Sequence, residues 1–115
     1  MRKALAALGC LSLGACGVDP SIPPYVTPSM PTTEAAGKGI KQAAADAHLT
    51  APIEMSDLRE TDHGPGRFIA CIRGVESKYQ RVVTYAVFFD NNDYKGLRLP
   101  VILDGCEKQS YHPLS

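Results

Sequence analysis

Residues 81–89 read RVVTYAVFF, a run in which β-branched and aromatic residues are dense. Such residues favour β-strands because their side chains pack well on a pleated, half-buried surface. Successive side chains of a strand point to opposite faces, and both faces of this segment are apolar, with Thr84 the only polar break. We therefore expect a strand that is covered on both of its faces.

Weaker strand patterns flank this segment. Residues 68–73 alternate between two faces, and residues 53–58 form the weakest candidate. After a turn predicted at residues 90–93, residues 97–103 alternate again, and Pro100 indicates an edge strand or a bulge. Short connections between the last three strands predict an antiparallel meander.

A helix is expected before the strands. Thr32 or Thr33 can cap it, and Glu34 is favourable near its positive end. Pro52 ends it by Ala51 at the latest. Its apolar face comprises Ala36, Ile40, Ala43, Ala44 and Ala47. The sequence thus predicts an α+β fold in which one N-terminal helix packs on a small antiparallel sheet of three to four strands, followed by an irregular tail.

The first residues predict an export signal. Arg2 and Lys3 precede an uncharged segment that is too short to span a bilayer but is typical of a signal peptide. Residues 13–16 (LGAC) resemble the lipobox of bacterial lipoproteins, which implies removal of residues 1–15 and acylation of Cys16 with a diacylglycerol and an N-acyl chain. Cys10 is the alternative lipid site, with a shorter apolar segment before it. An ordinary signal peptide, or a buried helix with an incidental cysteine, would also explain the segment.

The lipobox determines the expected domain organisation. Residues 16–31 contain five of the nine prolines and predict a tether, while residues 32–115 form one domain. Three acyl chains would hold the protein on the membrane. Gly17, in place of Asp, favours the outer membrane facing the periplasm over the inner membrane.

Two cysteines remain after cleavage and lipidation. Cys71 and Cys106 permit one intramolecular pairing, and an exported chain enters an oxidising compartment. We expect a disulfide in preference to two free thiols.

No composition or motif predicts catalysis. The full chain has a formal net charge of zero, which does not favour nucleic acid, and no small-molecule substrate or cofactor is expected. Residues 90–93 lack the spacing of a calcium loop, and residues 37–39 (GKG) lack the rest of a phosphate loop. His63 lies in a turn-rich segment, His48 near the helix end and His112 in the tail. We therefore expect neither an active site nor a metal site.

One face of the central segment is a candidate partner surface. A single helix covers only one face of a sheet, so the face that carries Val82, Ala86 and Phe88 needs another cover. Either the tail, through Tyr111 and Leu114, or another protein supplies it. The sheet edge beside Pro100 is a second possible docking site.

Two resemblances bear on function. The layout resembles that of small outer-membrane assembly lipoproteins. Residues 67–114 resemble small uncharacterised lipoproteins of Gram-negative bacteria, through Cys71-Ile72-Arg73, a Tyr-x-Val-Phe-Phe strand, and a distal Cys with the tail at residues 111–114 (YHPL). These resemblances imply an envelope lipoprotein that acts as a non-catalytic protein-binding or structural module. The alternative is a periplasmic inhibitor of a lysozyme-type hydrolase, although the Ser- and Gly-rich loop of such inhibitors is not found here.

Overall fold

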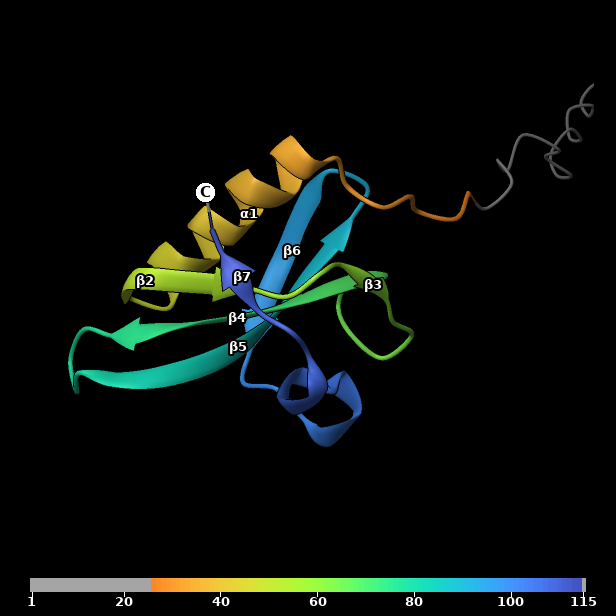
Figure 1. Cartoon of the computed structure of the whole chain (residues 1–115). Helices are drawn as coiled ribbons and strands as arrows, with labels where there is room; N and C mark the ends of the chain where they lie inside the picture. Colours follow the sequence, from red (N-terminus) through yellow and green to blue (C-terminus); the bar gives the residue numbers. More distant parts are fainter. Residues whose placement is uncertain (1–25, 115) are drawn as a thin grey trace, which may run out of the picture.

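A computed structural model describes residues 26–114. The expected signal peptide and Cys16 lie outside this range. The described chain forms one α-helix and an antiparallel sheet of six strands, so the α+β class is confirmed, but three to four strands was too few (Figure 1). In chain order the elements are α1 (Thr33–Asp46), β2 (Leu49–Met55), β3 (Arg59–Glu60), β4 (Phe68–Glu76), β5 (Arg81–Asp90), β6 (Asp93–Arg98), the 3-10 turns η2 (Ile102–Asp104) and η3 (Cys106–Lys108), and β7 (His112–Pro113).

Helix α1 begins where the sequence predicts. The Thr32 hydroxyl oxygen accepts a hydrogen bond from the backbone N–H of Ala35 (3.1 Å), which satisfies one of the free donors of the first turn. The helix buries a face of small residues, namely Ala36, Gly39, Ile40, Ala43 and Ala44. A Cβ atom at Gly39 would lie 2.3 Å from the ring of Phe89, so glycine at this position lets the helix approach the sheet closely.

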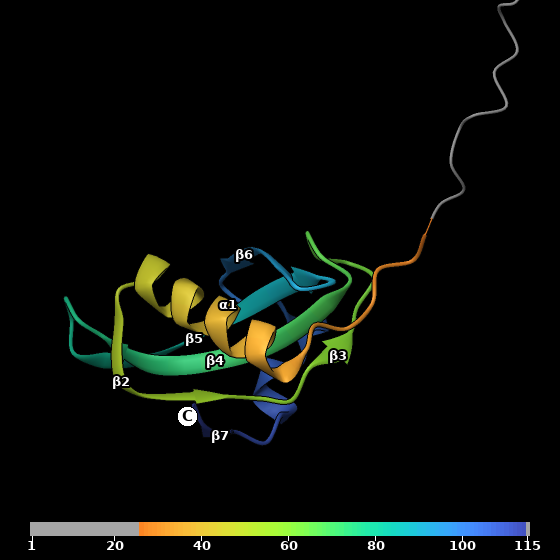
Figure 2. The ribbon, with the colours of Figure 1, turned by 90° about the horizontal axis from the view of Figure 1, so that it is seen from above.

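The sheet has the strand order β6-β5-β4-β2-β7, and β3 also pairs with β4. Strands β4, β5 and β6 form the predicted antiparallel meander, with Phe68 opposite Phe89 at one end of the β4–β5 pair and Glu76 opposite Arg81 at the other. Figure 2 shows α1 lying across one face of these strands. The two 3-10 turns lie on the opposite face, below the sheet in Figure 1.

The remaining strands are short or irregular, and β2 begins four residues before the weak strand predicted at residues 53–58. Strands β2 and β3 pair with successive parts of β4 and are separated at Ser56. The Ser56 backbone N–H donates to the carbonyl of Cys71, and the Ser56 hydroxyl oxygen accepts from the N–H of Cys71, both at 2.8 Å. The hydroxyl oxygen of Ser56 thus accepts the N–H of Cys71 in place of the backbone carbonyl that would accept it in a regular strand pair. Part of the tail, expected to be irregular, forms β7 on β2.

The last long strand occupies a different position from the predicted one. Strand β6 starts at Asp93, opposite Asp90, because Asn91 and Asn92 close a two-residue turn. Asn91 has a positive φ of 54°, which asparagine tolerates better than most residues. Residues 99–103, which the alternation predicts as part of this strand, therefore lie beyond its end.

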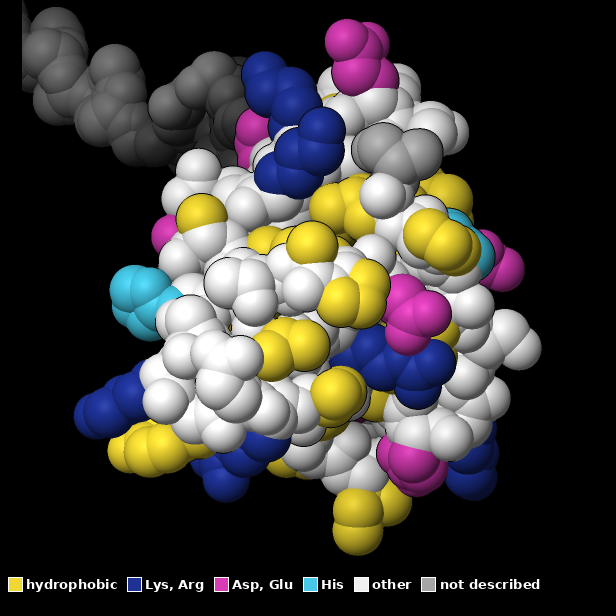
Figure 3. Space-filling view, turned by 60° about the vertical axis from the view of Figure 1, so that its left-hand side comes forward, with side chains coloured by type: hydrophobic (Ala, Val, Ile, Leu, Met, Phe, Trp, Pro, Cys, Tyr) yellow, Lys and Arg dark blue, Asp and Glu magenta, His cyan; other side chains and the backbone are white. Residues whose placement is uncertain are grey.

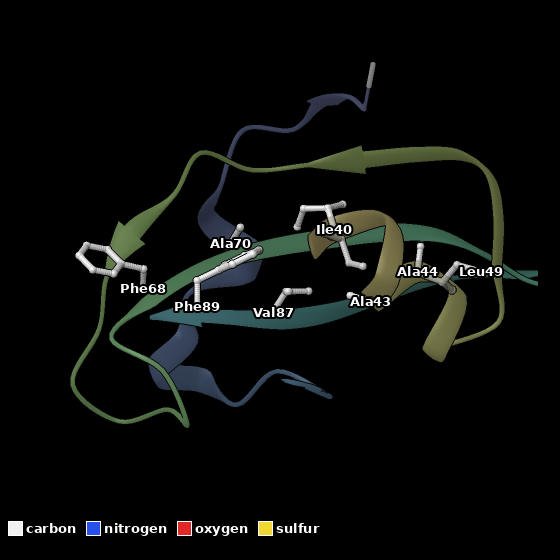
Figure 4. Close-up of a cluster of buried hydrophobic side chains, with 9 residues drawn as sticks. Ile40, Ala43, Ala44, Leu49, Phe68, Ala70, Val87 and Phe89 are labelled. Carbon is white, nitrogen blue, oxygen red and sulfur yellow. The ribbon is translucent and has the colours of Figure 1, made fainter. Parts of the chain in front are cut away.

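The core is divided by the sheet. On the helix face, Ile40, Ala43 and Ala44 pack with apolar side chains of β4 and β5 (Figure 4). On the opposite face, the buried cluster consists of Ile69, Cys71, Ala86, Phe88 and Cys106. The predicted disulfide is confirmed: Cys71 in β4 is bonded to Cys106 in η3, with their Cα atoms 5.6 Å apart. It holds the 3-10 turns against the sheet.

Candidate protein-binding surface

The most unusual exposed feature is the apolar loop, defined as residues 99–103 (LPVIL). Its four large aliphatic side chains are exposed: Leu99 by 63%, Val101 by 48%, Ile102 by 86% and Leu103 by 72%. Figure 3 shows hydrophobic side chains projecting at the bottom of the molecule, the height at which Figure 1 places the 3-10 turns. Single exposed apolar residues are ordinary, whereas clustered ones mark interaction sites.

A buried carboxylate fixes this loop. Asp104 is fully buried, and its two oxygens accept hydrogen bonds from the backbone N–H of Val101 (2.9 Å) and from Nη2 of Arg98 (3.0 Å). The carbonyl oxygen of Asp104 accepts from Arg59. Gly105 follows with a φ of 65°, a left-handed conformation that favours glycine and lets the chain turn from η2 into η3. The apolar loop is therefore bonded to the strands at its base.

The arginines at the base also pack on the sheet. The Arg98 guanidinium lies 4.7 Å from the centroid of the Phe88 ring, and its Nη2 also donates to the carbonyl of His63 (3.2 Å). Arg98 therefore links β6, the turn around His63 and the buried carboxylate of Asp104. This network places the carboxylate of Asp104 beneath the apolar loop, where the guanidinium of Arg98 balances its charge.

A groove of about 320 Å³ lies beside the loop, on the sheet face opposite α1. Its lining residues include Arg73, Thr84, Val101, Ile102 and Tyr111. The Arg73 guanidinium is 4.1 Å from the Tyr111 ring centroid, and its Nε is 2.6 Å from Oε1 of Glu54. The Tyr111 hydroxyl donates to the carbonyl of Cys106 (2.8 Å), and burial raises the pKa of this phenol. The groove thus has one aliphatic wall and one wall in which Arg73 is paired with Glu54, and Glu107 also lines it.

The predicted partner face requires a correction. Ala86 and Phe88 are fully buried, because the segment that carries Cys106 and Tyr111 packs on them. Val82 is 68% exposed. The face is therefore covered by the chain itself over the half near the disulfide and left open over the half near Val82. Of the three predicted residues, only Val82 is available to a partner.

One histidine lies at the base of the apolar loop. His63 Nδ1 is 2.9 Å from Asp62, and its Nε2 is 3.5 Å from Asp104, whose oxygens already accept from Arg98 and Val101. The hydrogen bond to His63 lowers the pKa of Asp62. The hydroxyl of Thr61 lies 3.3 Å from Nε2 of His63, and Thr61 is only 9% exposed. This arrangement orients the imidazole beside a hollow of about 400 Å³ that Leu103 also lines.

The other histidines lie apart from this cluster. His112 Nε2 is 3.2 Å from the exposed Asp57, and His48 adopts a positive φ just after α1. Among residues 26–114, no group of three or more His, Cys, Asp or Glu side chains is placed to hold a metal ion. In the same range, no helix is long and apolar enough to cross a membrane.

Sequence reasoning missed the apolar loop and its support. The alternation over residues 97–103 predicts a strand, but the run LPVIL lacks the polar positions of a half-exposed strand and contains Pro100. That absence of polar positions was the available signal. Nothing in the local sequence indicates that Asp104 is buried, since its partners Arg98 and Arg59 are set by the fold. Cys16 lies outside the described residues.

The three comparisons with known proteins gave no match. No protein-family model, no curated protein and no solved structure matches the chain.

Proposed function

We propose that the chain is a lipid-anchored envelope lipoprotein of a Gram-negative bacterium, that it acts as a non-catalytic binding module for another envelope protein, and that it faces the periplasm from the outer membrane. The sequence LGAC at residues 13–16 and Gly17 support the anchor and its location. The apolar loop supports the binding role.

The observation that carries the binding role is the combined exposure and fixation of the loop. Four aliphatic side chains are held in water, at a cost of about 25 cal/mol for each Å² of apolar surface that stays exposed. The buried network of Asp104 and Arg98 keeps them there. A fixed loop loses little conformational entropy on binding, so the apolar area it buries contributes more fully to affinity.

The position of the loop suits a partner in the aqueous space. The N-terminal segment contacts the β5–β6 turn, where Ser29 and Thr32 donate their backbone N–H groups to the side-chain oxygens of Asn91 and Asn92 (2.9 and 3.0 Å). The apolar loop follows the other end of β6, and Figure 1 shows the two regions at opposite ends of the domain. A chain anchored through its N-terminus can therefore present the loop away from the anchor.

The test is capture of a partner by the full-length lipoprotein and by its Ile102→Asp variant, after chemical cross-linking in the envelope. Ile102 is 86% exposed, so the variant should keep its urea midpoint while the specific adduct is lost. Val26→Asp is the matched control, because Val26 is also exposed (78%) but lies in the N-terminal segment. The captured protein is then purified, and its affinity for each variant is measured. Equal affinity for wild type and Ile102→Asp would exclude the loop as the binding site.

A hydrolase inhibitor is the second candidate, and one observation favours it. The apolar loop projects between two hollows and is backed by the Cys71–Cys106 disulfide, as suits a loop that enters a cleft. The same experiment separates the two functions. An inhibitor would capture a hydrolase and lower its turnover, and Ile102→Asp would restore that turnover; a structural or scaffolding partner would show no such effect.

A further inference from the structure

A guanidinium lies against the disulfide. Nη2 of Arg59, in β3, is 3.5 Å from Sγ of Cys71 and also donates to the carbonyl of Asp104. Within residues 26–114, the ion pairs join other side chains, so the Arg59 guanidinium has no carboxylate partner in that range. Its Nε is buried there without a hydrogen-bond acceptor. Arg59 is therefore held beside a sulfur atom with part of its bonding capacity unused.

The unused capacity of Arg59 is satisfied when the disulfide is reduced. A buried donor without an acceptor and a cation without a counter-ion both cost free energy. In the reduced protein, a thiolate on Cys71 would supply both the anion and the acceptor. Cys71 is fully buried in a cluster with Ile69, Ala86 and Phe88, and opposite charges attract more strongly in such apolar surroundings than in water. Arg59 is thus placed to stabilise the reduced form of Cys71.

The two cysteines differ in their surroundings. Cys106 is 3% exposed and lines the groove of about 320 Å³, whereas Cys71 is fully buried. Glu107 follows Cys106 and lines the same groove, so a carboxylate lies on the side of Cys106 and a guanidinium on the side of Cys71. The buried carboxylate of Asp104 is balanced by Arg98 (3.0 Å). Negative charge on sulfur is therefore favoured at Cys71 over Cys106.

We propose that Cys71–Cys106 is a reactive disulfide that a dithiol reduces, with Cys106 as the sulfur attacked and Cys71 as the leaving group. A thiolate of the dithiol bonds to Sγ of Cys106, and the electron pair of the broken disulfide bond passes to Sγ of Cys71, which becomes a thiolate beside Arg59. The second thiol of the dithiol then displaces Cys106 from the mixed disulfide. The dithiol is oxidised by two electrons to a disulfide; of its two protons, one passes to Cys106 and one to solvent.

Reduction would also affect the apolar loop. The disulfide is the covalent link between β4 and η3, and η3 follows η2 through Gly105. Arg59, which bonds to the carbonyl of Asp104, gains the Cys71 thiolate as a competing partner. Amide exchange over residues 99–105, measured by mass spectrometry, should therefore be faster in the reduced chain than in the oxidised one; equal exchange would contradict this consequence. The inference goes beyond the proposed function, because the reactivity of the disulfide does not depend on a binding partner.

The first test locates the sulfur that is attacked. The full-length lipoprotein is extracted in detergent, treated briefly with glutathione and quenched with acid, and the position of each adduct is read from its peptides. Glutathione should be found mainly on Cys106, with a free thiol at Cys71. Adducts mainly on Cys71, adducts in equal amounts on both cysteines, or an intact disulfide would each overturn the proposal.

The second test measures the contribution of Arg59. The chain is equilibrated with mixtures of reduced and oxidised dithiothreitol, and the fraction that retains the Cys71–Cys106 disulfide is measured. Arg59→Gln should raise the ratio of reduced to oxidised dithiothreitol needed for half reduction by about tenfold, the effect of losing one hydrogen bond to a charged group. Arg59→Lys keeps the positive charge and should restore part of this shift, which a merely structural role of the side chain would not predict.

Arg81→Gln is the matched control. It removes the same charge from an exposed arginine that is paired with Glu76 (3.2 Å), at the far end of the β4–β5 pair. Its half-reduction ratio should equal that of wild type. Equal ratios for Arg59→Gln and Arg81→Gln, or identical ratios for Arg59→Gln and Arg59→Lys, would overturn the role of Arg59 and with it the proposal.

Discussion

At the residue scale, Asp104 couples stability to the candidate site. Its carboxylate is fully buried and serves two donors at once, the backbone of Val101 and the side chain of Arg98. A buried carboxylate is tolerated only when its partners replace water. Loss of this one side chain would therefore loosen the apolar loop and leave the Arg98 guanidinium without a carboxylate to balance its charge.

Asp104→Ala should lower the free energy of unfolding by about 3 kcal/mol, the lower part of the range for breaking a buried ion pair, since the Arg98 side chain is partly exposed. Urea unfolding of the full chain measures this change. Asp57→Asn is the control, because the Asp57 side chain is 91% exposed and, among residues 26–114, it forms an ion pair with His112 alone. Equal midpoints for the two variants would contradict the role of Asp104.

The raised pKa of Tyr94 predicts that the free energy of unfolding falls at alkaline pH. Burial, together with its hydrogen bond to Asp46 (3.0 Å), raises the pKa of this phenol from 10.0 to about 12. A raised pKa means that the folded state favours the protonated phenol, so the stabilisation is complete below pH 10 and is lost as the pH rises through about 12. Tyr94→Phe should remove this part of the alkaline loss of stability. Phenolate absorbance should show the highest-titrating tyrosine disappear in this variant; an unchanged titration curve would contradict the assignment.

At the element scale, the disulfide joins the second half of the chain into one unit. It links β4 to η3 across 35 positions, and the chain between these positions includes β5 and β6. The covered half of the sheet face depends on this link, because Cys106 packs with Ile69, Ala86 and Phe88.

Replacing both Cys71 and Cys106 by serine should destabilise the fold by about 4 kcal/mol, on the entropy of closing a loop of this length in the unfolded chain. Reduction of the wild-type protein with a thiol should produce the same loss in a urea titration. The double variant itself should not respond to the reductant. A wild-type midpoint that is insensitive to reduction would contradict the prediction.

The elements that could be predicted are those with a local pattern. The apolar period of α1, the β-branched run of β5 and the two-residue turn at Asn91 all lie within short stretches of sequence. Strands β3 and β7 could not be predicted, because two residues carry no period and pair only once β4 and β2 are in place. The apolar loop differs from the predicted strand: β6 ends at Arg98, and the buried Asp104 bonds to Arg98 and to the backbone of Val101, contacts that the local sequence does not show.

The candidate site was predictable in part. The disulfide followed from assigning Cys10 to the signal peptide and Cys16 to the lipid, because Cys71 and Cys106 then have one possible pairing. The covered and open halves of the second sheet face could not be distinguished, because the cover comes from residues far along the chain, namely Cys106 and Tyr111. Val82 and Phe88 have similar local surroundings in the sequence, yet one is exposed and the other is buried.

At the scale of the whole molecule, the N-terminal segment determines where the domain can lie. Between Cys16 and Ser29, the chain can span at most about 45 Å. Ser29 contacts the β5–β6 turn, at the end of the domain opposite the apolar loop. With a lipid on Cys16, the loop would be able to reach a protein in the aqueous space beyond the anchoring leaflet.

Cys16→Ser should abolish metabolic labelling with a fatty acid and leave an uncleaved or soluble precursor. The reason is that the proposed lipid is attached to the thiol of Cys16. Cys10→Ser is the matched control and should be labelled and cleaved like wild type. Labelling that persists in Cys16→Ser would place the lipid elsewhere or show an ordinary signal peptide.

The cover that Cys106 provides has a consequence for biogenesis. Chains are made from the N-terminus, so Phe88 and Ala86 are synthesised well before the segment that later hides them. A nascent chain interrupted before residue 106 would have an uncovered apolar sheet face and an unpaired thiol at Cys71. Truncated products should therefore be recognised by chaperones and proteases, and formation of the Cys71–Cys106 disulfide would report that both cysteines had reached the oxidising compartment.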